Sequence, residues 1–144
     1  MGQDRDVDVL ARTLWGEARG EGAAGMVAVG WTIRNRVETD LGNDGKPDWW
    51  GEGYVGVCRA PWQFSCWNKN DPNYQYLSGA KQIPAGEYLR AREAALAVIS
   101  GSQLDPTGGA THYYATTMPK PPAWAAKAKR TVVIGHHAFF RDVP

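Results

Sequence analysis

The sequence has few residues that bind metals or form cross-links. Its 144 residues include two cysteines, Cys58 and Cys66, and three histidines, His112, His136 and His137. None of these lies in the HExxH or CxxC arrangement that is typical of a zinc site. We therefore expect no metal and no other cofactor. The two cysteines could close a short loop in an oxidising compartment or remain as two buried thiols.

Long apolar runs and an excess of charge of one sign are also absent. No apolar run is long enough to span a bilayer, and the first residues, MGQDRDVDV, have neither the basic start nor the apolar core of a signal peptide. The formal net charge is +1 with 22% charged residues, so no basic field covers the chain that could hold nucleic acid by its phosphates. We expect no membrane insertion and no nucleic-acid partner.

The length and the lack of linkers favour one domain. A chain of 144 residues can bury a core without metals or several disulfides. No internal repeat, low-complexity tract or linker divides it. We expect a single domain over residues 1–144, with a monomer as the default.

A patterned stretch near the N-terminus, residues 10–21, carries carboxylates at the end of an apolar run. Val7, Leu10 and Leu14 lie three and four residues apart, so on a helix they share one face, and Glu17 follows three residues later on that face. A buried, unpaired carboxylate keeps its proton to higher pH, which is the property that a general acid needs near neutral pH. The pattern makes Glu17 a candidate catalytic residue.

The same stretch leaves two alternatives open. Gly16 and Gly20 could end the helix before Glu17 or Glu21 points inward, and both would then be solvated surface glutamates. If the helix continues, a spacing of four residues keeps both glutamates on one face. Periodicity alone does not choose between them.

The rest of the chain predicts helices, one long loop and a closing hairpin. The second helix is apolar nearly all round, which is typical of a central buried helix. The first is expected to be capped by Asp6 or Asp8, and a glycine-rich elbow over residues 16–25 follows it. The predicted elements are helices over 7–17, 23–38 and 85–100, loops over 39–56 and 70–84, an extended segment over 110–115, a helical turn over 124–129 and strands over 131–134 and 138–141.

Aromatic residues are abundant, with seven Trp, six Tyr and three Phe. Their flat apolar faces can pack in a core or stack on sugar rings. Trp62, Gln63, Phe64, Ser65 and Trp67 place stacking surfaces and hydrogen-bonding groups within six positions. Recognition of an amphipathic sugar requires that combination, although a structural plug beneath a loop would look similar.

Two further sets of residues have alternative interpretations. The loop over 39–56 presents Trp49, Trp50 and Tyr54, which could form a cleft wall or pack beneath the loop. Asn35 lies near the end of the second predicted helix. It is either a structural hydrogen-bonding residue or a residue that reaches an adjacent cleft.

Five separated stretches carry a resemblance to a known family. They are LARTLWGEARGE at 10–21, GMVAVGWTIRNRV at 25–37, APWQFSCWN at 60–68, DPTGGATHYY at 105–114 and GHHAFFR at 135–141. Together they resemble the cell-wall hydrolases of the spore-cortex-lytic, SleB-like type, found in bacteria and phages. The resemblance implies a mainly helical α+β, lysozyme-like fold with a small β-hairpin or sheet, related to goose-type lysozymes and lytic transglycosylases. It also implies cleavage of the glycan strands of peptidoglycan.

The resemblance implies roles for individual residues. Glu17, the first glutamate of GEARGE, matches the general acid at the end of the first long helix, and Glu21 and Asn35 would support it. His112 departs from the aromatic or small residue expected at its position, and no role is predicted for it. The residues implied to orient the acetamide and stack the sugar ring are Gln63, Phe64, Ser65, Trp67, Tyr113 and Tyr114.

The chemistry follows from the bond that such a family cleaves. A protonated Glu17 would donate its proton to the β-1,4 glycosidic oxygen between N-acetylmuramic acid and N-acetylglucosamine as an oxocarbenium-like sugar develops. It would then deprotonate either the sugar's own 6-hydroxyl, as in a lytic transglycosylase, or water, as in a hydrolytic muramidase. No second acid motif of comparable strength lies outside this helix end, which favours the transglycosylase.

Two other classes of function stay open. One is a non-catalytic peptidoglycan-binding module in which Glu17 is incidental. The other is a zinc amidase that uses His112, His136 and His137.

The expected setting follows from what spore-lytic members often carry. An export signal and a wall-binding repeat are both missing, so we expect a single-domain phage endolysin. Such a protein is made in the cytoplasm without a signal peptide and acts on the wall, in the periplasm, after a pore opens the membrane. Cys58 and Cys66 could oxidise on arrival.

Overall fold

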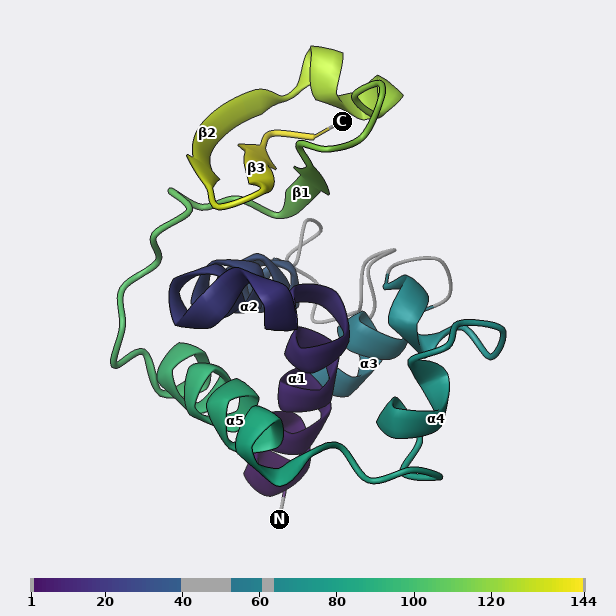
Figure 1. The fold of residues 1–144 in the computed structure, drawn as a ribbon. Helices are drawn as coiled ribbons and strands as arrows, with labels where there is room; N and C mark the ends of the chain where they lie inside the picture. The colour runs from purple at the N-terminus through teal and green to yellow at the C-terminus, as the bar shows by residue number, and fades with distance from the viewer. Residues whose placement is uncertain (1, 40–52, 61–63, 144) are drawn as a thin grey trace.

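The computed structural model describes residues 2–39, 53–60 and 64–143, and it combines a helical part with a small sheet (Figure 1). This confirms the predicted mainly helical α+β fold. The elements are α1 (Gly2–Ala18), η1 (Arg19–Glu21), α2 (Gly22–Glu38), α3 (Gly53–Arg59), η2 (Ser65–Trp67), α4 (Tyr74–Leu77), α5 (Ala85–Ser100), β1 (His112–Ala115), η3 (Ala123–Lys127), β2 (Lys129–Ile134) and β3 (His137–Arg141), where η marks a 3-10 turn.

Helix α1 begins earlier than predicted. It already includes Gly2, so Asp6 and Asp8 lie inside the helix and neither caps it. Asp8 instead pairs with Arg12 one turn later, at 3.0 Å between Oδ2 and Nε, and accepts a hydrogen bond of 2.6 Å from the Tyr88 hydroxyl. The Asp8 carboxylate thus links the side of α1 to α5. Because it is engaged in these contacts, Asp8 does not cap the start of the helix.

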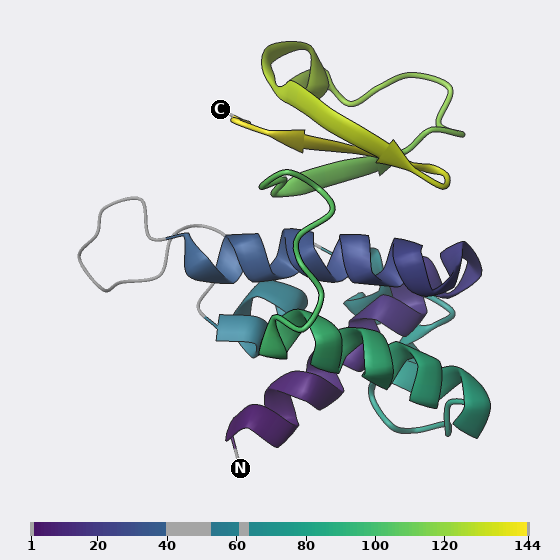
Figure 2. The same cartoon turned by 90° about the vertical axis from the view of Figure 1, so that its left-hand side faces the viewer.

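Helix α2 is the central element, as its apolar pattern predicts. It packs against α1, α3 and α5, and the sheet lies across its other side (Figure 2). Its buried residues occupy most of its circumference. They are Gly25, Met26, Val27, Ala28, Val29, Gly30, Thr32, Ile33 and Arg36.

The turn between α1 and α2 is shorter than the predicted glycine-rich elbow. Gly16 lies in α1 and Gly25 in α2, and only the three residues of η1 separate the helices. Gly16 allows a close approach, because a Cβ there would lie 2.7 Å from the Cβ of Cys66. Gly22 has a φ of 75°, which glycine adopts without strain, and this conformation starts α2.

The third predicted helix is confirmed, whereas two short helices were not predicted. Helix α5 follows Pro84 and ends at Gly101, which has a φ of 74°. Helix α4 lies in the predicted loop over 70–84, and α3 begins in the predicted loop over 39–56 and ends in a segment for which no helix or strand was predicted. Helices α3 and α4 have only seven and four residues, which is too short for a helical period to show, and α3 is stabilised by packing on α1 and α2.

The sheet has the antiparallel order β1-β3-β2. The predicted hairpin of the last two strands is confirmed, and β1 pairs with the other side of β3 with Tyr113 opposite Phe139 and Tyr114 opposite Ala138. Neighbouring residues of a strand point to opposite faces. One face therefore carries Tyr113 and Phe139 towards the helices, and the other carries Tyr114 and Phe140.

The described residues answer one further prediction. Cys58 and Cys66 are buried free thiols, which is the second of the two predicted alternatives. Within the described ranges, no helix combines the length and apolar character that a bilayer crossing needs.

Candidate active site

Glu17 lies in the last turn of α1, where the helices meet the sheet. The helix continues to Ala18, so Gly16 does not end it before Glu17. The Glu17 side chain is half-buried, and its Oε1 atom accepts a hydrogen bond of 2.9 Å from the Tyr113 hydroxyl. Two residues that are 96 positions apart therefore meet at one carboxylate.

Tyr113 is held among other rings of the sheet. Its ring centroid lies 4.9 Å from that of His137 and 5.8 Å from that of Phe139. Burial, reinforced by the charge of Glu17, raises the pKa of Tyr113 well above its ordinary value of 10.0. The hydroxyl therefore stays protonated and donates to Glu17 throughout the neutral pH range.

The thiol of Cys66 also contacts Glu17. Burial raises the pKa of Cys66 far above its ordinary value, and the charge of Glu17 and a hydrogen bond to it act in the same direction. Burial raises the pKa of Cys58 to about 12. Because neither thiol ionises near neutral pH, both act as small packing groups rather than nucleophiles.

Arg36 places a buried positive charge beneath strand β1. Its side chain is 6% exposed, and its Nε donates a hydrogen bond of 2.5 Å to the Thr111 carbonyl. Burial lowers the pKa of Arg36 to about 10, against the attraction of Tyr113, Cys58 and Glu17, so it remains a cation at neutral pH. Arg36 was not among the predicted site residues. Its signal was that it is one of two arginines, with Arg34, on a largely apolar helix.

Glu21 connects η1 to the turn between β2 and β3. Its Oε1 accepts a hydrogen bond of 2.8 Å from the His136 backbone N–H, and its Oε2 lies 2.9 Å from His136 Nδ1. The side-chain hydrogen bond from His136 is the main reason that the pKa of Glu21 is lowered. His137 Nδ1 lies 3.3 Å from Oε1. Because His137 contacts Tyr113, Glu21 holds the hairpin on which the Tyr113 position depends.

Asn35 supports the chain that leads into β1. Its Nδ2 donates hydrogen bonds of 3.0 Å to Asp105 Oδ2 and 2.9 Å to the Ala110 carbonyl. Asp105 in turn accepts bonds from Thr107 and Gly109. Asn35 is thus a structural hydrogen-bonding residue that fixes the turn ahead of β1, and this is one of its two predicted interpretations.

The aromatic segment before α4 contributes little open surface. Phe64 is 2% exposed, and its ring lies beneath the Arg36 guanidinium. The Arg36 Cζ atom lies 5.3 Å from the centroid of that ring. Trp67 donates a hydrogen bond of 2.9 Å to Thr13 Oγ1 and packs against the helices. Ser65 is exposed beside Cys66. Four other residues of the prediction lie outside the described residues; they are Gln63, Trp49, Trp50 and Trp62.

The structure does not bring Tyr114 to Glu17. Successive side chains of β1 point to opposite faces of the sheet, so Tyr114 faces away from Tyr113 and stacks on Phe140, with 5.5 Å between ring centroids. His112 shares that outer face and contacts Trp124, with 5.2 Å between ring centroids. The prediction that both tyrosines line one groove did not account for this alternation.

The three histidines do not converge either. His112 lies on the outer face of the sheet, while His136 and His137 contact Glu21. Over the ranges that the structure describes, no group of three or more His, Cys, Asp or Glu residues is placed to hold a metal ion. The arrangement gives no support to zinc amidase chemistry.

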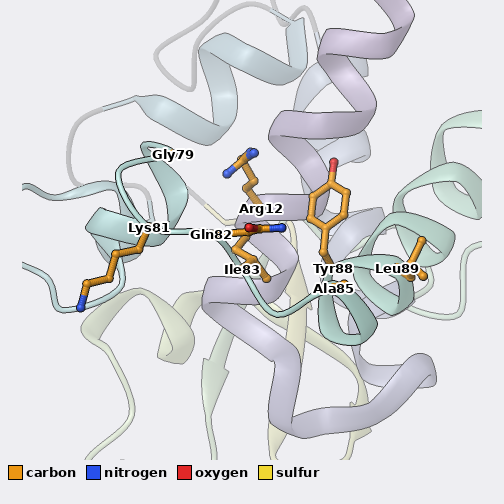
Figure 3. A pocket seen from close by; sticks show the side chains of 8 residues that line it. All are labelled: Arg12, Gly79, Lys81, Gln82, Ile83, Ala85, Tyr88 and Leu89. Atoms are coloured by element: carbon orange, nitrogen blue, oxygen red, sulfur yellow. The ribbon is translucent and has the colours of Figure 1, made fainter.

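A pocket of about 500 Å³ lies on another side of α1 (Figure 3). Arg12, five positions from Glu17 and so on a different side of the helix, belongs to it. Asp8 and the Tyr76 carbonyl already hold the Arg12 guanidinium. The described lining contains no carboxylate, and it is formed by Arg12, Gly79, Lys81, Gln82, Ile83, Ala85, Tyr88 and Leu89. This pocket therefore offers no acid for glycosidic chemistry.

Sequence comparison identifies relatives of the chain. A family model described as cell wall hydrolase matches residues 20–140. The spore cortex-lytic enzyme of Halalkalibacterium halodurans is 32% identical over 111 residues. That alignment covers 77% of this chain and 27% of the relative, so the chain spans only that smaller part of the relative's length. The family match contains Glu21, Arg36 and Tyr113 and begins just after Glu17.

Two solved structures have a similar fold. The catalytic domain of the germination-specific lytic transglycosylase SleB from Bacillus anthracis has a TM-score of 0.66 and 28% identity, with 94% of this chain and 93% of that chain covered. The catalytic domain of the Bacillus cereus SleB protein has a TM-score of 0.67 and 28% identity, with 96% and 91% covered.

Proposed function

The chain belongs to the cell wall hydrolase family, and we propose that it cleaves the glycan strands of peptidoglycan with Glu17 as its single general acid and base. The bond cleaved is the β-1,4 bond between N-acetylmuramic acid and N-acetylglucosamine. The observation that carries the proposal is the hydrogen bond between Glu17 and Tyr113 at the junction of the helices and the sheet. The similarity to the lytic transglycosylase SleB supports the same chemistry.

The first step breaks the glycosidic bond. Protonated Glu17 gives its proton to the bridging oxygen, the bond from that oxygen to C1 of the muramic acid breaks, and an oxocarbenium-like sugar forms. The Tyr113 hydroxyl orients the carboxyl group through Oε1. Arg36 attracts the negative charge that appears on Glu17 as the proton leaves.

The second step closes a ring within the sugar. The Glu17 carboxylate takes the proton of the 6-hydroxyl, and that oxygen bonds to C1 to give a 1,6-anhydro product. The cycle consumes no water and returns Glu17 to its protonated state. A hydrolytic muramidase would use water in place of the 6-hydroxyl, with the same glutamate.

The environment of Glu21 favours the ring-closing outcome. Glycosidases that hydrolyse usually have two carboxylates that flank the bond. Glu21 is the carboxylate next to Glu17 in sequence, but both of its oxygens already contact His136. It is therefore poorly placed to activate water, and the proposal assigns it a supporting role.

Mass analysis of the fragments released from purified peptidoglycan tests the reaction type. In water enriched in heavy oxygen, the proposed reaction releases anhydro-ended fragments without the label. Labelled reducing ends would contradict it in favour of hydrolysis, and freed peptides would contradict it in favour of an amidase. If no fragment is released although the protein binds peptidoglycan, the binding-module alternative is supported.

We also propose the biological setting. The protein acts as a phage endolysin, made in the cytoplasm and active as a monomer on the wall after a pore opens the membrane, with one catalytic domain over residues 1–144. The SleB catalytic domain, which covers 94% of this chain, supports the single domain. Expression in bacteria with and without a pore-forming protein tests the setting. We expect lysis only with the pore, and lysis without it would contradict the proposed release route.

A further inference from the structure

A groove of about 530 Å³ lies on the outer face of the sheet, between the sheet and the segment that contains η3. Tyr114 and Phe140 form its aromatic side and stack at 5.5 Å with 24° between their planes. Small apolar residues and one cation complete much of its lining; they include Pro121, Pro122, Ala126 and Arg130. Because Tyr113 points to the opposite face, this groove is separate from the Glu17 site.

The part of the chain around this groove is basic. Residues 112–144 contain five Lys or Arg and one Asp, a net charge of +4, whereas residues 1–111 contain eleven Lys or Arg and fourteen Asp or Glu, a net charge of −3. Four of the cations are exposed and have no ion-pair partner within the described part of the chain. They are Lys120, Lys127, Lys129 and Arg130. The charge favours an anionic ligand.

The walls of the groove favour a peptide over a sugar. A sugar ring needs an open aromatic face to stack on. Phe140 is only 5% exposed, and both Tyr114 and Trp124 already pack against it. Proline and alanine side chains form much of the rest of this open groove, which suits small aliphatic side chains. Arg130, opposite Phe140 in the sheet register, is placed to pair with a carboxylate.

We propose that this groove binds the acidic stem peptide of peptidoglycan, with the peptide's alanine side chains against the proline and alanine residues of the groove and a carboxylate on Arg130. The proposal rests on peptidoglycan as the substrate, as argued above, and adds a second contact with it. A stem peptide bound on the outer face would keep the enzyme on the wall while Glu17 acts on a glycan strand. The groove should therefore affect the KM for intact peptidoglycan more than kcat.

Binding is measured by calorimetry with the full chain carrying Glu17→Gln, which prevents turnover. The ligands are a synthetic stem peptide, the same peptide with its carboxylates amidated, and glycan strands stripped of peptide. We expect the acidic peptide to bind and the amidated peptide to bind at least about tenfold more weakly, because a charge-assisted pair is lost. Adding Arg130→Gln should weaken binding of the acidic peptide by a similar factor.

Arg90→Gln is the matched control, because Arg90 is an exposed arginine on α5 and the variant changes net charge equally. Equal weakening by both variants would overturn the proposal, as would no binding of the acidic peptide. Binding of an anionic polyphosphate or of anionic vesicles as tight as binding of the peptide would overturn it too.

Cleavage of peptide-free glycan by the wild type separates the peptide-binding proposal from the proposed activity. Cleavage without peptide binding defeats only the groove, and peptide binding without cleavage defeats only the proposed activity.

Discussion

Three groups that interact with Glu17 keep one protonation state near neutral pH. Tyr113 and Cys66 remain neutral donors because burial raises their pKa values, and Arg36 remains cationic although burial lowers its pKa to about 10. The neighbours therefore present a fixed set of dipoles and one fixed charge. The proposed mechanism assigns the moving proton to Glu17, and this makes the Tyr113 hydrogen bond the first contact to test.

Tyr113→Phe removes the hydroxyl that donates to Glu17 Oε1 and keeps the buried ring. We expect kcat on peptidoglycan to fall about tenfold, the equivalent of about 1.4 kcal/mol in activation free energy. The free energy of unfolding should change by about 1 kcal/mol or less. Tyr74→Phe, which loses a hydroxyl on the short helix α4, is the control. Unchanged kcat in Tyr113→Phe would show that the bond does not serve catalysis.

His112 predicts a pH dependence of stability. Burial, with a smaller contribution from Arg36, lowers its pKa to about 4 from 6.5. Between these values the unfolded chain binds a proton that the folded protein does not, so stability falls as pH drops from 6.5 towards 4. We expect the titration of His112 to account for a loss of about 2 kcal/mol in the free energy of unfolding. This is less than the whole pKa shift would give, because solvent screens a partly exposed side chain.

Denaturant unfolding of the wild type and His112→Phe at several pH values checks this prediction. The phenylalanine keeps a ring against Trp124 and cannot titrate. The unfolding free energy of the variant should decline less on acidification. Parallel curves for the two proteins would contradict the assignment.

At the scale of elements, Glu21 determines how the hairpin meets the helices. The carboxylate lies at the end of η1 and contacts the turn after β2, where Gly135 has a φ of 58°. A Cβ at position 135 would lie 3.1 Å from Glu21 Oε1, so glycine allows the close approach. The helix end that bears Glu17 and the strand that bears Tyr113 are thus joined by a second contact beside Glu17.

Glu21→Gln should loosen this contact, because a neutral amide is a weaker acceptor than a carboxylate. We expect the free energy of local opening in β2 and β3, measured by amide hydrogen exchange, to fall by about 1 kcal/mol. Exchange in α1, α2 and α5 should be unaffected. Because the pKa of Glu21 is lowered in the fold, its stabilisation is present at neutral pH and is lost as pH falls below the ordinary value of 4.5. The variant should lack that acid-dependent loss.

Glu38→Gln is the control for this prediction. Glu38 also pairs with a cation, Arg34, but on the exposed flank of α2. Its variant should leave exchange in β2 and β3 unchanged. If the two variants behave alike, Glu21 does not hold the hairpin.

The sequence predicts elements with long or well-marked patterns. Helix α2 follows from its apolar run, and α5 follows from its start after Pro84 and its end at Gly101. The short helices α3 and α4 are stabilised by tertiary packing and have no period to detect. The start of α1 was missed because Asp8 pairs with Arg12 and Tyr88 rather than capping the helix.

The site was predictable only in part, because its contacts are distant in sequence. Periodicity made Glu17 a candidate without excluding a solvated position or Glu21, and the pairing with Tyr113 depends on how β1 lies over α1 and α2. The choice between Tyr113 and Tyr114 depends on the register with β3, which no local pattern gives. Arg36 was missed because an arginine near a helix end is usually solvated.

At the scale of the whole molecule, the sheet lies across α2 on the side away from α5 (Figure 2). This arrangement brings the end of the first helix against the first strand, and it leaves the outer face of the sheet, with Arg130, turned away from the helices. The proposed cleavage site and the proposed peptide groove therefore lie on opposite faces of one small sheet. Both depend on the same three strands.

The central claim is that Glu17 carries out the acid and base steps. The most direct test is the rate at which Glu17→Gln releases fragments from purified peptidoglycan, with Glu93→Gln, an exposed carboxylate on α5, as the control. We predict a loss of about 10² to 10⁴-fold for Glu17→Gln, with cooperative unfolding retained and with wild-type activity in the control. Full activity in a well-folded Glu17→Gln protein would contradict the account.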